Sequence, residues 1–551
     1  MTAFAAPLKS DQADAYTPAR EQLDFIIAHL KSTLRMTFND LEQFLKENGP
    51  EILRLCIQGF LDERGPGAVD EPVLDAMEQE HTHRRLNPRS VTTNFGKVTV
   101  TRQGYGGRGL KSLHPLDAEL NLSPESYSQA LHRQIAETAA KESYDEVGAS
   151  ILGQTGVKVP KRQLEECVAR AAQDFEGFYE QQRAAEPQEV NASSEILALS
   201  MDQKGVPMRK ADLLKATRKA ADERRPHLKY RRSKGEKPHT KRLSTVAAVY
   251  TVAPFVRTPE QIVGEMGTVH EVPLQRPRPE NKRVWASVER PLDDILIQAF
   301  DEAFRRDPEL NKQWVALVDG DESQLAALAL AAKKADVNLI IILDIIHVLE
   351  YLWKAAFVFY DEADPAAEAW VKPRLTQILR GNSSLVAAGI RRSATLRQLD
   401  EKKRGPVDKC ADYLLKYAPH LRYDQYLAKG YPIATGVIEG ACRYLVKDRM
   451  EITGSRWSLK GAESVLRLRS LRASGDFNEY WAFHLQQERE RNHVSKYKDG
   501  RVPLSALAAR GESKVSHLQL VEVQKDEEAK QVPASYDSIE SISLRNWISK
   551  K

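Results

Sequence analysis

The stretch that decides the fold runs from Trp314 to Trp353 and reads WVALVDGDESQLAALALAAKKADVNLIIILDIIHVLEYLW. Two short apolar runs, Val315–Val318 and Leu339–Leu343, are each followed by an aspartate, and a segment with a helical period lies between them. This pattern predicts a strand, a helix and a second strand. Because parallel neighbouring strands deliver their ends to one edge of a sheet, we expect Asp319 and Asp344 at that edge.

These aspartates have two interpretations within this window. Asp is a common turn and N-cap residue, so Asp319 can simply open a turn and Asp344 can simply start a helix. The other interpretation is a catalytic one. Two distant acids favour it, because Asp202 ends another strand-like run and Glu439 begins a helix.

Length and composition set broad bounds. A chain of 551 residues is too long for one core, so we expect roughly two to four domains. The formal charge of +4 says little, because the positions of the basic residues matter more. The four cysteines form no CxxC pair, which fits a reducing cytoplasm without a disulfide framework. No signal pattern or membrane span is expected.

Periodicity and composition divide the chain into segments. We expect a helical region (1–88), a β-hairpin with a loop (89–122), a helix-turn-helix region (123–190), the first part of a mixed α/β core (191–344, with a basic insertion at about 209–242), an all-α insertion (345–432), the last part of the core with the Glu439 helix (433–490) and a polar, largely disordered tail (491–551).

Apolar runs predict the strands of the core. The first three precede any clear core helix and suggest an antiparallel meander, whereas helices precede the fourth and fifth. We therefore expect a mixed five-stranded α/β sheet in which the first strand, ending at Asp202, lies beside the fourth, ending at Asp319. The runs are EILALSM (195–201), TVAAVYTV (245–252), VWASV (284–288), WVALV (314–318) and LIIIL (339–343).

The segment VGASILGQTGVKVPKRQLEECVARAAQDF has the spacing of a DNA-reading helix-turn-helix. Gly156 breaks the first helix, and Pro160 is expected at the first position of the second. Lys161, Arg162 and Gln163 at the start of that second helix suit contacts with phosphates and base edges. An ordinary helical hairpin fits the same pattern.

The basic insertion contains few acids to balance its charge. A solvated loop is the usual interpretation of such a run. Its position beside Asp202 favours contact with nucleic-acid phosphates, for which we select Arg231, Arg232 and Lys234.

Three carboxylates at one site indicate metal-ion chemistry. Asp202, Asp319 and Glu439 cannot all stay ionised at contact distance unless cations neutralise them. Magnesium prefers hard oxygen ligands. Two such ions about 4 Å apart activate an attacking water or 3′-hydroxyl and stabilise the leaving oxygen. The expected cofactor is Mg²⁺ or Mn²⁺, with two ions per site.

An ordered string of motifs extends from about residue 92 to 484. The motifs are SVTTNFGKVTVTR, HPLDAELNLSPESYS, VGASILGQTGVKVPKRQLEECVARAAQDF, LSMDQKGVPM, KRVWAS, WVALVDGDESQL, LDIIHVLEYLWKAA and PIATGVIEGACRYLVKDRMEITGSRWS. With them the chain resembles DDE transposases with an RNase H-like fold, most closely the ISKra group of bacterial insertion-sequence transposases. The resemblance implies an RNase H-like core interrupted by an α-helical insertion.

The resemblance also implies roles for particular residues. Asp202, Asp319 and Glu439 are then the catalytic, metal-binding acids. In transposases of this broad type, including the Mutator-like and hAT groups, a Cys/Asp-x-x-His element follows the second acid, and Asp344 with His347 matches it as an accessory pair.

Alternatives remain open at two of these positions. Asp321 is a near alternative to Asp319, and His347 on an apolar helix also fits a packed, hydrogen-bonded histidine. The residues that follow the catalytic glutamate suit phosphate binding and base stacking, although a core role for the tryptophan is also open. They are Arg443, Lys447, Arg449, Arg456 and Trp457.

The implied function is transposition. Such an enzyme binds double-stranded DNA at terminal inverted repeats and at the target, hydrolyses phosphodiesters and transfers strands, as a homodimer or larger synaptic assembly without a membrane partner. A bacterial cytoplasm, at the nucleoid, is the expected location. Relatives often carry a CxxC-like pair where this chain has Gly104–Gly109, so no zinc is expected. The alternatives are a catalytically silent, domesticated DNA-binding protein and an RNase H-like nuclease.

Overall fold

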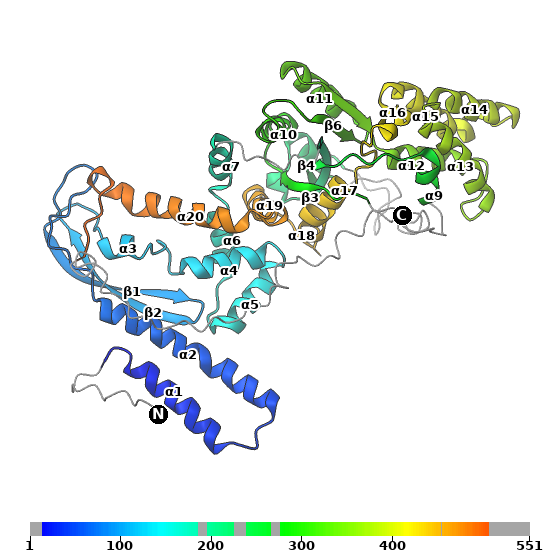
Figure 1. Ribbon diagram of the computed structural model, residues 1–551. Coiled ribbons are helices and arrows are strands. Elements are labelled where there is room, and N and C mark those ends of the chain that lie inside the picture. The colour runs from blue at the N-terminus through cyan, green and yellow to red at the C-terminus, as the bar shows by residue number, and fades with distance from the viewer. Residues whose placement is uncertain (1–13, 186–194, 225–237, 266–275, 453, 506–551) are drawn as a thin grey trace, which may run out of the picture. The chain divides into compact units, whose positions relative to one another are not determined.

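The computed structural model describes residues 14–185, 195–224, 238–265, 276–452 and 454–505 (Figure 1). These residues fall into two compact units. The first unit contains 14–178 and 477–505, and the second contains 179–476. Within these ranges, no helix has both the length and the apolar character needed to cross a bilayer.

The second unit is built on a mixed five-stranded sheet with the order β5-β4-β3-β6-β7. β4 pairs antiparallel with β3 and β5, whereas β6 pairs parallel with β3 and β7. The mixed α/β core and the pairing of the first strand with the fourth are therefore confirmed. The strands are β3 (Ile196–Pro207), β4 (Lys241–Val252), β5 (Glu280–Ser287), β6 (Gln313–Val318) and β7 (Leu339–Leu343).

The central strands are buried on both faces. β3 is buried from Ile196 to Met201 and β4 from Ser244 to Val252, so these strands are continuous apolar runs and not alternating ones. The helix α10 (Leu292–Arg306) contacts both strands. A sheet held in this way has little freedom to change its register.

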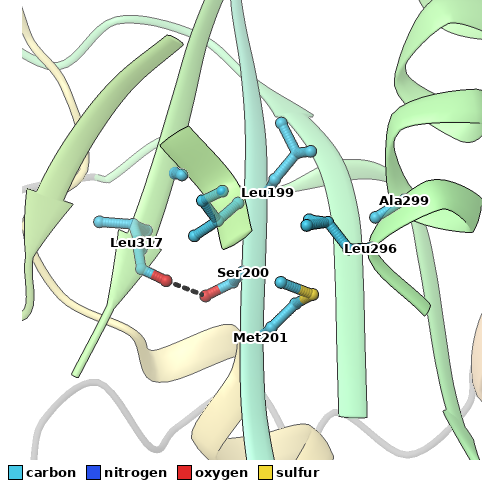
Figure 2. Close-up of a pocket in the computed structure, with 8 residues that line it drawn as sticks. Leu199, Ser200, Met201, Leu296, Ala299 and Leu317 are labelled. Atoms are coloured by element: carbon cyan, nitrogen blue, oxygen red, sulfur yellow. Dashed lines mark hydrogen bonds between the residues drawn. The ribbon is translucent and has the colours of Figure 1, made fainter. Parts of the chain in front are cut away.

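Figure 2 shows how α10 packs on the sheet. Leu296 and Ala299 of α10 lie beside Met201 of β3, and no water-sized space remains among the side chains around them. The Ser200 hydroxyl donates a hydrogen bond to the Leu317 carbonyl oxygen of β6 over 3.1 Å. This bond adds a side-chain link between the two parallel strands that lead to the acidic residues.

The outer edge of β5 is covered by α19 (Leu459–Ser474). The Val284 N–H donates to Ser474 Oγ over 3.0 Å, and the Ala286 N–H donates to Ser470 Oγ over 3.2 Å. These serine hydroxyls satisfy backbone groups that an open edge strand would present to another chain.

A buried ion cluster joins α10 to β5. Glu302 is 1% exposed and lies 2.9 Å from Arg283 and 2.7 Å from Arg306. Arg305 also pairs with Glu302, over 2.8 Å. Burial by itself raises the pKa of a carboxyl, but the three guanidinium groups outweigh it and lower the pKa of Glu302. The carboxylate therefore stays charged inside the unit.

The chain after β7 is helical up to the segment that carries Glu439, as the periodicity predicts. α12 contacts α13 and α15, and α14 contacts α15, so that these helices form a group beside the sheet (Figure 1). The helices of the second unit not yet named are α8 (Lys215–Asp222), α9 (Pro259–Glu265), α11 (Glu322–Lys334), α12 (Ile345–Ala356), α13 (Pro365–Leu379), α14 (Ser383–Leu396), α15 (Glu401–Lys416), α16 (Tyr423–Ala428), α17 (Gly436–Ala441) and α18 (Asp448–Met450).

The first unit combines helices with a β-hairpin. β1 and β2 pair antiparallel with Thr93 opposite Gly96, so Asn94 and Phe95 form the turn of the hairpin. Val91, Val98 and Val100 of the hairpin share a buried cluster. The elements are α1 (Thr17–Ser32), α2 (Phe38–Arg64), β1 (His83–Thr93), β2 (Gly96–Gly106), α3 (Pro115–Glu119), α4 (Gln129–Ala139), α5 (Tyr144–Thr155), α6 (Lys161–Ala171), α7 (Phe175–Ala184, which continues into the second unit) and α20 (Phe477–Asn492).

The segment predicted as a helix-turn-helix forms the two helices α5 and α6. Gly156 ends α5 in the left-handed region, with φ at 66°, where glycine is favoured. The sequence predicts Pro160 at the first position of α6, and this prediction is wrong. It is the N-cap with an extended backbone, and α6 begins one residue later at Lys161.

The segment from 491 to 505 is structured, in contrast to the disordered tail predicted from residue 491 onward. α20 continues to Asn492, and Tyr497 is buried in a cluster with Val69 and Val73. The Ser505 N–H donates to a Glu119 carboxylate oxygen over 2.7 Å. These partners lie hundreds of residues earlier, so a local window of polar sequence does not show them. Residues 506–551 lie outside the described residues.

The ion cluster on α10 gives the first prediction. Replacing Glu302 with Ala leaves the buried guanidinium groups of Arg283 and Arg306 uncompensated, which costs about 3–5 kcal/mol. Urea denaturation followed by tryptophan fluorescence measures this loss. The control is Asp301→Ala on the exposed side of the same helix, which should change stability by no more than about 0.5 kcal/mol. Equal effects of the two substitutions would contradict the argument.

Candidate functional site

The parallel registers bring three aspartates to one edge of the sheet. β3 and β6 are paired up to Leu317, and β6 and β7 are paired up to Leu343. Continuing these registers by one or two residues places Asp202 opposite Asp319, and Asp319 opposite Asp344. Because adjacent strands lie about 4.8 Å apart, the three residues form a row across β3, β6 and β7. Asp319 and Asp344 directly follow β6 and β7, but the prediction that the first strand ends at Asp202 is wrong, because β3 continues to Pro207 through its pairing with β4. We call this the acid row.

The turn that carries Asp319 is held by residues at the end of α15. Tyr413 Oη donates to the Asp319 carbonyl oxygen over 3.2 Å, and Tyr417 Oη donates to the Gly320 carbonyl oxygen over 2.7 Å. Gly320 has φ at 100°, and a Cβ there would lie 3.2 Å from Leu343 Cδ1. Only glycine suits this close turn, so the α-helical insertion helps to fix the position of Asp319.

Asp321, the alternative to Asp319, has a structural role. It is the N-cap of α11, and its Oδ1 accepts the Gln324 N–H over 3.0 Å. The Ser323 hydroxyl and the Gln324 N–H lower the pKa of this exposed carboxyl. The Asp321 N–H donates to Asp319 Oδ1 over 3.0 Å. Because capping occupies the carboxylate of Asp321, the geometry favours Asp319 as the member of the acid row.

Asp344 is fully buried, at 0% exposure, and is held at both oxygens. The Ile346 N–H donates to Oδ1 over 2.9 Å at the N-terminus of α12, and the Thr435 hydroxyl donates to Oδ2. Burial raises the pKa of Asp344, while these hydrogen bonds oppose the shift. Burial also raises the pKa of Tyr413, and the negative charges of Asp344 and Asp319 both add to this shift. Both aspartates are therefore near the same tyrosine.

Glu439 lies on a helical run packed against the sheet. The run consists of α17, a π-helical segment η3 (Cys442–Lys447) and α18. Both α17 and η3 contact β3. Single π-helical turns within α-helices are frequent at functional sites. The Ile345 N–H donates to the Ile433 carbonyl oxygen over 3.0 Å, which brings the chain before this run beside Asp344.

The electrostatics of Glu439 connect it to the acid row. The pKa of Glu439 is raised to about 7, mainly by burial; the negative charges of Asp344 and Asp202 contribute to the shift, whereas His347 opposes it. Glu439 is therefore within electrostatic reach of residues on two different strands of the row.

Cys442 ties the Glu439 helix to β3. Its Sγ donates to Asp202 Oδ2 over 3.2 Å, and the Gln203 N–H donates to Asp202 Oδ1 over 2.6 Å. Burial raises the pKa of the Cys442 thiol, with Asp202 adding to the shift, so the thiol is neutral and able to donate. The sequence analysis did not select Cys442. Its position three residues after Glu439, on the same helical face, is the signal that would have identified it.

The structure groups the metal-binding side chains in a way that differs in part from the predicted trio. Ligand atoms of Asp344, His347 and Glu439 all lie within 4.8 Å of one another. Asp202, Asp319 and Glu439 do not form such a close group among the residues that the structure describes. Joint metal binding by that trio stays a prediction.

The donor set fits a divalent cation. Burial raises the pKa of both Glu439 and Asp344, and the negative charges of Asp344 and Asp202 add to the shift at Glu439. A bound cation relieves this repulsion, because it favours the charged form of nearby carboxylates. Carboxylate oxygens are ligands that magnesium and manganese prefer.

The three candidates on α6 are exposed at the start of that helix. Lys161 Nζ lies 2.9 Å from Asp145, and Arg162 Nε lies 3.0 Å from Glu166. Exposed ion pairs of this kind contribute little to stability. Lys161, Arg162 and Gln163 therefore remain accessible to an anionic partner.

The remaining candidates for DNA binding divide into three groups: those outside the described residues, those that are exposed and those that are buried. Arg231, Arg232 and Lys234 of the basic insertion lie outside the described residues. The exposed candidates on and after the Glu439 helix are Arg443, Lys447 and Arg456.

Arg449 and Trp457 form the third group, and their positions correct the expectation that they contact DNA. Both are buried, and the guanidinium of Arg449 lies 4.8 Å from the centre of the Trp457 ring. Trp457 Nε1 donates to the Met450 carbonyl oxygen over 3.0 Å. Arg449 of α18 points into the core, where its cation over the Trp457 ring links α18 to the chain that follows it.

Comparisons with known proteins give little further information. No protein-family model matches the chain, and no curated protein matches it. A solved structure with some similarity is the Drosophila P element transposase strand transfer complex, which is 10% identical over 66% of this chain and 88% of that chain, with a TM-score of 0.18. At this TM-score the similarity carries no argument about fold or activity.

The raised pKa of Glu439 predicts a pH-dependent stability. The carboxyl titrates near 4.5 in the unfolded chain and near 7 in the metal-free fold, so the folded state holds the proton more tightly. Wild-type stability therefore falls as the pH rises from about 4.5 to about 7. Glu439→Gln cannot ionise and avoids this loss, so in EDTA it should exceed the wild type by on the order of 2–3 kcal/mol at pH 8.

Chemical denaturation of both proteins at several pH values measures this difference. The advantage of Glu439→Gln should shrink as the pH falls toward 4.5, since the wild-type carboxyl is then protonated in both states. An advantage that is the same at all pH values would show that it does not come from titration of this carboxyl.

Proposed function

We propose that this chain is a DNA transposase of the DDE type, in which an RNase H-like core carries out metal-dependent phosphodiester hydrolysis and strand transfer. The observation that carries the proposal is the acid row with Glu439 packed against it. A fold that gathers carboxylates side by side across three neighbouring strands destabilises itself unless the site binds cations. The ordered motifs from about residue 92 to 484 support the same class of enzyme.

The residues divide into ligands and supports. Asp202, Asp319 and Glu439 are the proposed ligands of Mg²⁺ or Mn²⁺. Asp344 has both oxygens engaged by hydrogen bonds and is fully buried, which suits an accessory role beside His347. When bound, a pair of divalent ions would supply activation of the attacking oxygen and stabilisation of the leaving oxygen.

The proposed chemistry has two displacements at phosphorus. In the first, a water oxygen attacks the phosphodiester at the element end, and the bond to O3′ breaks, so that the element ends in a 3′-hydroxyl and the flank keeps the phosphate. In the second, that 3′-hydroxyl attacks a phosphodiester of the target and displaces its O3′. Neither step needs a covalent bond between protein and DNA. The contribution of the protein is to position the reacting groups and to stabilise developing charge.

DNA binding is assigned to basic residues in both units. Lys161, Arg162 and Gln163 are proposed to read the terminal inverted repeats, and Arg443 and Lys447 to hold phosphates near the cleavage point. Joining two element ends requires at least a homodimer. A bacterial cytoplasm, at the nucleoid, is the proposed location.

The assignment of the second acid can be tested with neighbouring variants. In Mg²⁺, Asp319→Asn should lower the rate of cleavage of DNA fragments that carry the flanks of the coding region by roughly a thousandfold, since removal of a metal ligand forfeits several kcal/mol of transition-state stabilisation. Asp321→Asn is the matched control, because Asn is as good an N-cap as Asp, and its rate should stay near that of the wild type.

The products distinguish the proposal from its alternatives. A transposase cleaves the element end and joins the new 3′-hydroxyl to target DNA. Specific binding without cleavage in Mg²⁺ or Mn²⁺ would instead indicate a catalytically silent DNA-binding protein. Cleavage without joining would indicate a nuclease.

The exposed lysine on the Glu439 helix gives a separate prediction about affinity. If Lys447 contacts a phosphate, Lys447→Ala should reduce the slope of log affinity against log salt concentration by about one. Lys334→Ala is the control, because Lys334 is an exposed lysine in the last turn of α11, before β7 begins. Fluorescence anisotropy over a salt series measures both. Identical slopes for the wild type and Lys447→Ala would exclude the contact.

A further inference from the structure

A second cluster of metal-binding side chains lies in the first unit. Glu125 precedes α4, His132 lies on α4 and Cys167 lies on α6. One ligand atom from each lies within 4.8 Å of the others. His132 and Cys167 are buried, at 2% and 1% exposure, and α4 contacts α6 directly. A carboxylate, an imidazole and a thiol are the ligand types that zinc prefers.

At the nitrogen that faces the cluster, the buried histidine makes an ion-pair contact with Glu125 but no aligned hydrogen bond. His132 Nε2 lies 3.1 Å from Glu125 Oε2, close enough for attraction, but the two atoms are not aligned for a hydrogen bond. Among the described residues, no other group bonds to this nitrogen. A buried nitrogen without a well-aligned hydrogen bond costs free energy, and a metal ion would remove that cost by taking the lone pair.

The charge next to the cluster is balanced without using the ligand atoms. Arg170 lies 2.8 Å from Glu125 Oε1 and 3.3 Å from Glu488, so its positive charge is shared by two carboxylates. Glu125 Oε2 remains directed toward His132. Carboxylates that bind metals are commonly hydrogen-bonded by an outer group in this way, which fixes their orientation.

A neighbouring cluster of similar composition shows the difference. Asp174, His484 and Glu488 also bring their ligand atoms within 4.8 Å of one another. There His484 Nδ1 lies 2.6 Å from Asp174 Oδ2, and Arg491 pairs with both acids. Each of these acids and the histidine has a protein partner, so that cluster is a complete polar network and provides no argument for an ion.

We propose that Glu125, His132 and Cys167 bind a transition-metal ion of the zinc class, with the fourth position left to water. The ion would connect the segment before α4 to α4 itself and to α6. Its role is structural, because it fixes α6, whose first turn presents Lys161 and Arg162 to solvent. The site does not depend on the proposed activity and is separate from the acid row.

The test uses the full-length protein, stripped with EDTA and titrated with Co²⁺, which replaces Zn²⁺ and gives a thiolate-to-cobalt absorption band when a cysteine is a ligand. We expect one such band per chain, which added Zn²⁺ abolishes. The band should be lost in Cys167→Ser. It should persist in Cys410→Ser and Cys442→Ser, the matched controls, since these cysteines are equally buried and Cys442 lies beside the acid row.

Zinc affinity provides a second readout. Loss of an outer-shell partner alone weakens metal binding by about 10–100-fold, so His132→Gln should weaken zinc binding by at least about a hundredfold. If circular dichroism shows that Cys167→Ser is unfolded, His132→Gln and Glu125→Gln decide the matter. The proposal would be overturned if the wild type shows no thiolate band, if folded Cys167→Ser keeps the band, or if Cys442→Ser loses it. Unchanged zinc affinity in both His132→Gln and Glu125→Gln would also overturn it.

Discussion

Repulsion among carboxylates at one edge of a sheet is the constraint on which the second unit depends. The parallel registers of β3, β6 and β7 bring Asp202, Asp319 and Asp344 to equivalent positions, and the buried strands behind them cannot shift to separate the charges. The pKa of Glu439 is raised to about 7, first by burial and then by the negative charges of Asp344 and Asp202. A site that stores such unfavourable electrostatics is typical of function, because structural needs alone would favour apolar residues there.

The groups that hold the acids come from chain segments far away in sequence. Tyr413 fixes the Asp319 turn, Thr435 bonds to the Asp344 carboxylate and Cys442 bonds to Asp202. Each contact satisfies one polar group and leaves other carboxylate lone pairs open. The α-helical insertion and the segment after it are therefore part of the site, since they hold in place residues that repel one another.

The first unit shows how a single missing partner distinguishes a candidate ligand site from a polar network. The absence of CxxC pairs argued against zinc, yet Glu125, His132 and Cys167 converge through the packing of α4 on α6. The expectation of no zinc rested on ligand spacing within a loop. Ligands contributed by two helices have no such spacing to recognise. The histidine hydrogen bond that the cluster of Asp174, His484 and Glu488 has, and that His132 lacks, is visible only in three dimensions.

The sequence by itself determined the strands, the mixed sheet, the hairpin and most helices, because apolar periodicity and turn residues act locally. It also selected Asp202 and Asp319, although Asp202 lies within β3 and does not end it. Only the tertiary structure decided that Asp344, His347 and Glu439 are the closest group, that Arg449 and Trp457 are buried, and that 491–505 is structured. Burial and metal-binding geometry depend on how elements that are separate in the chain pack together, and no local pattern encodes those distances.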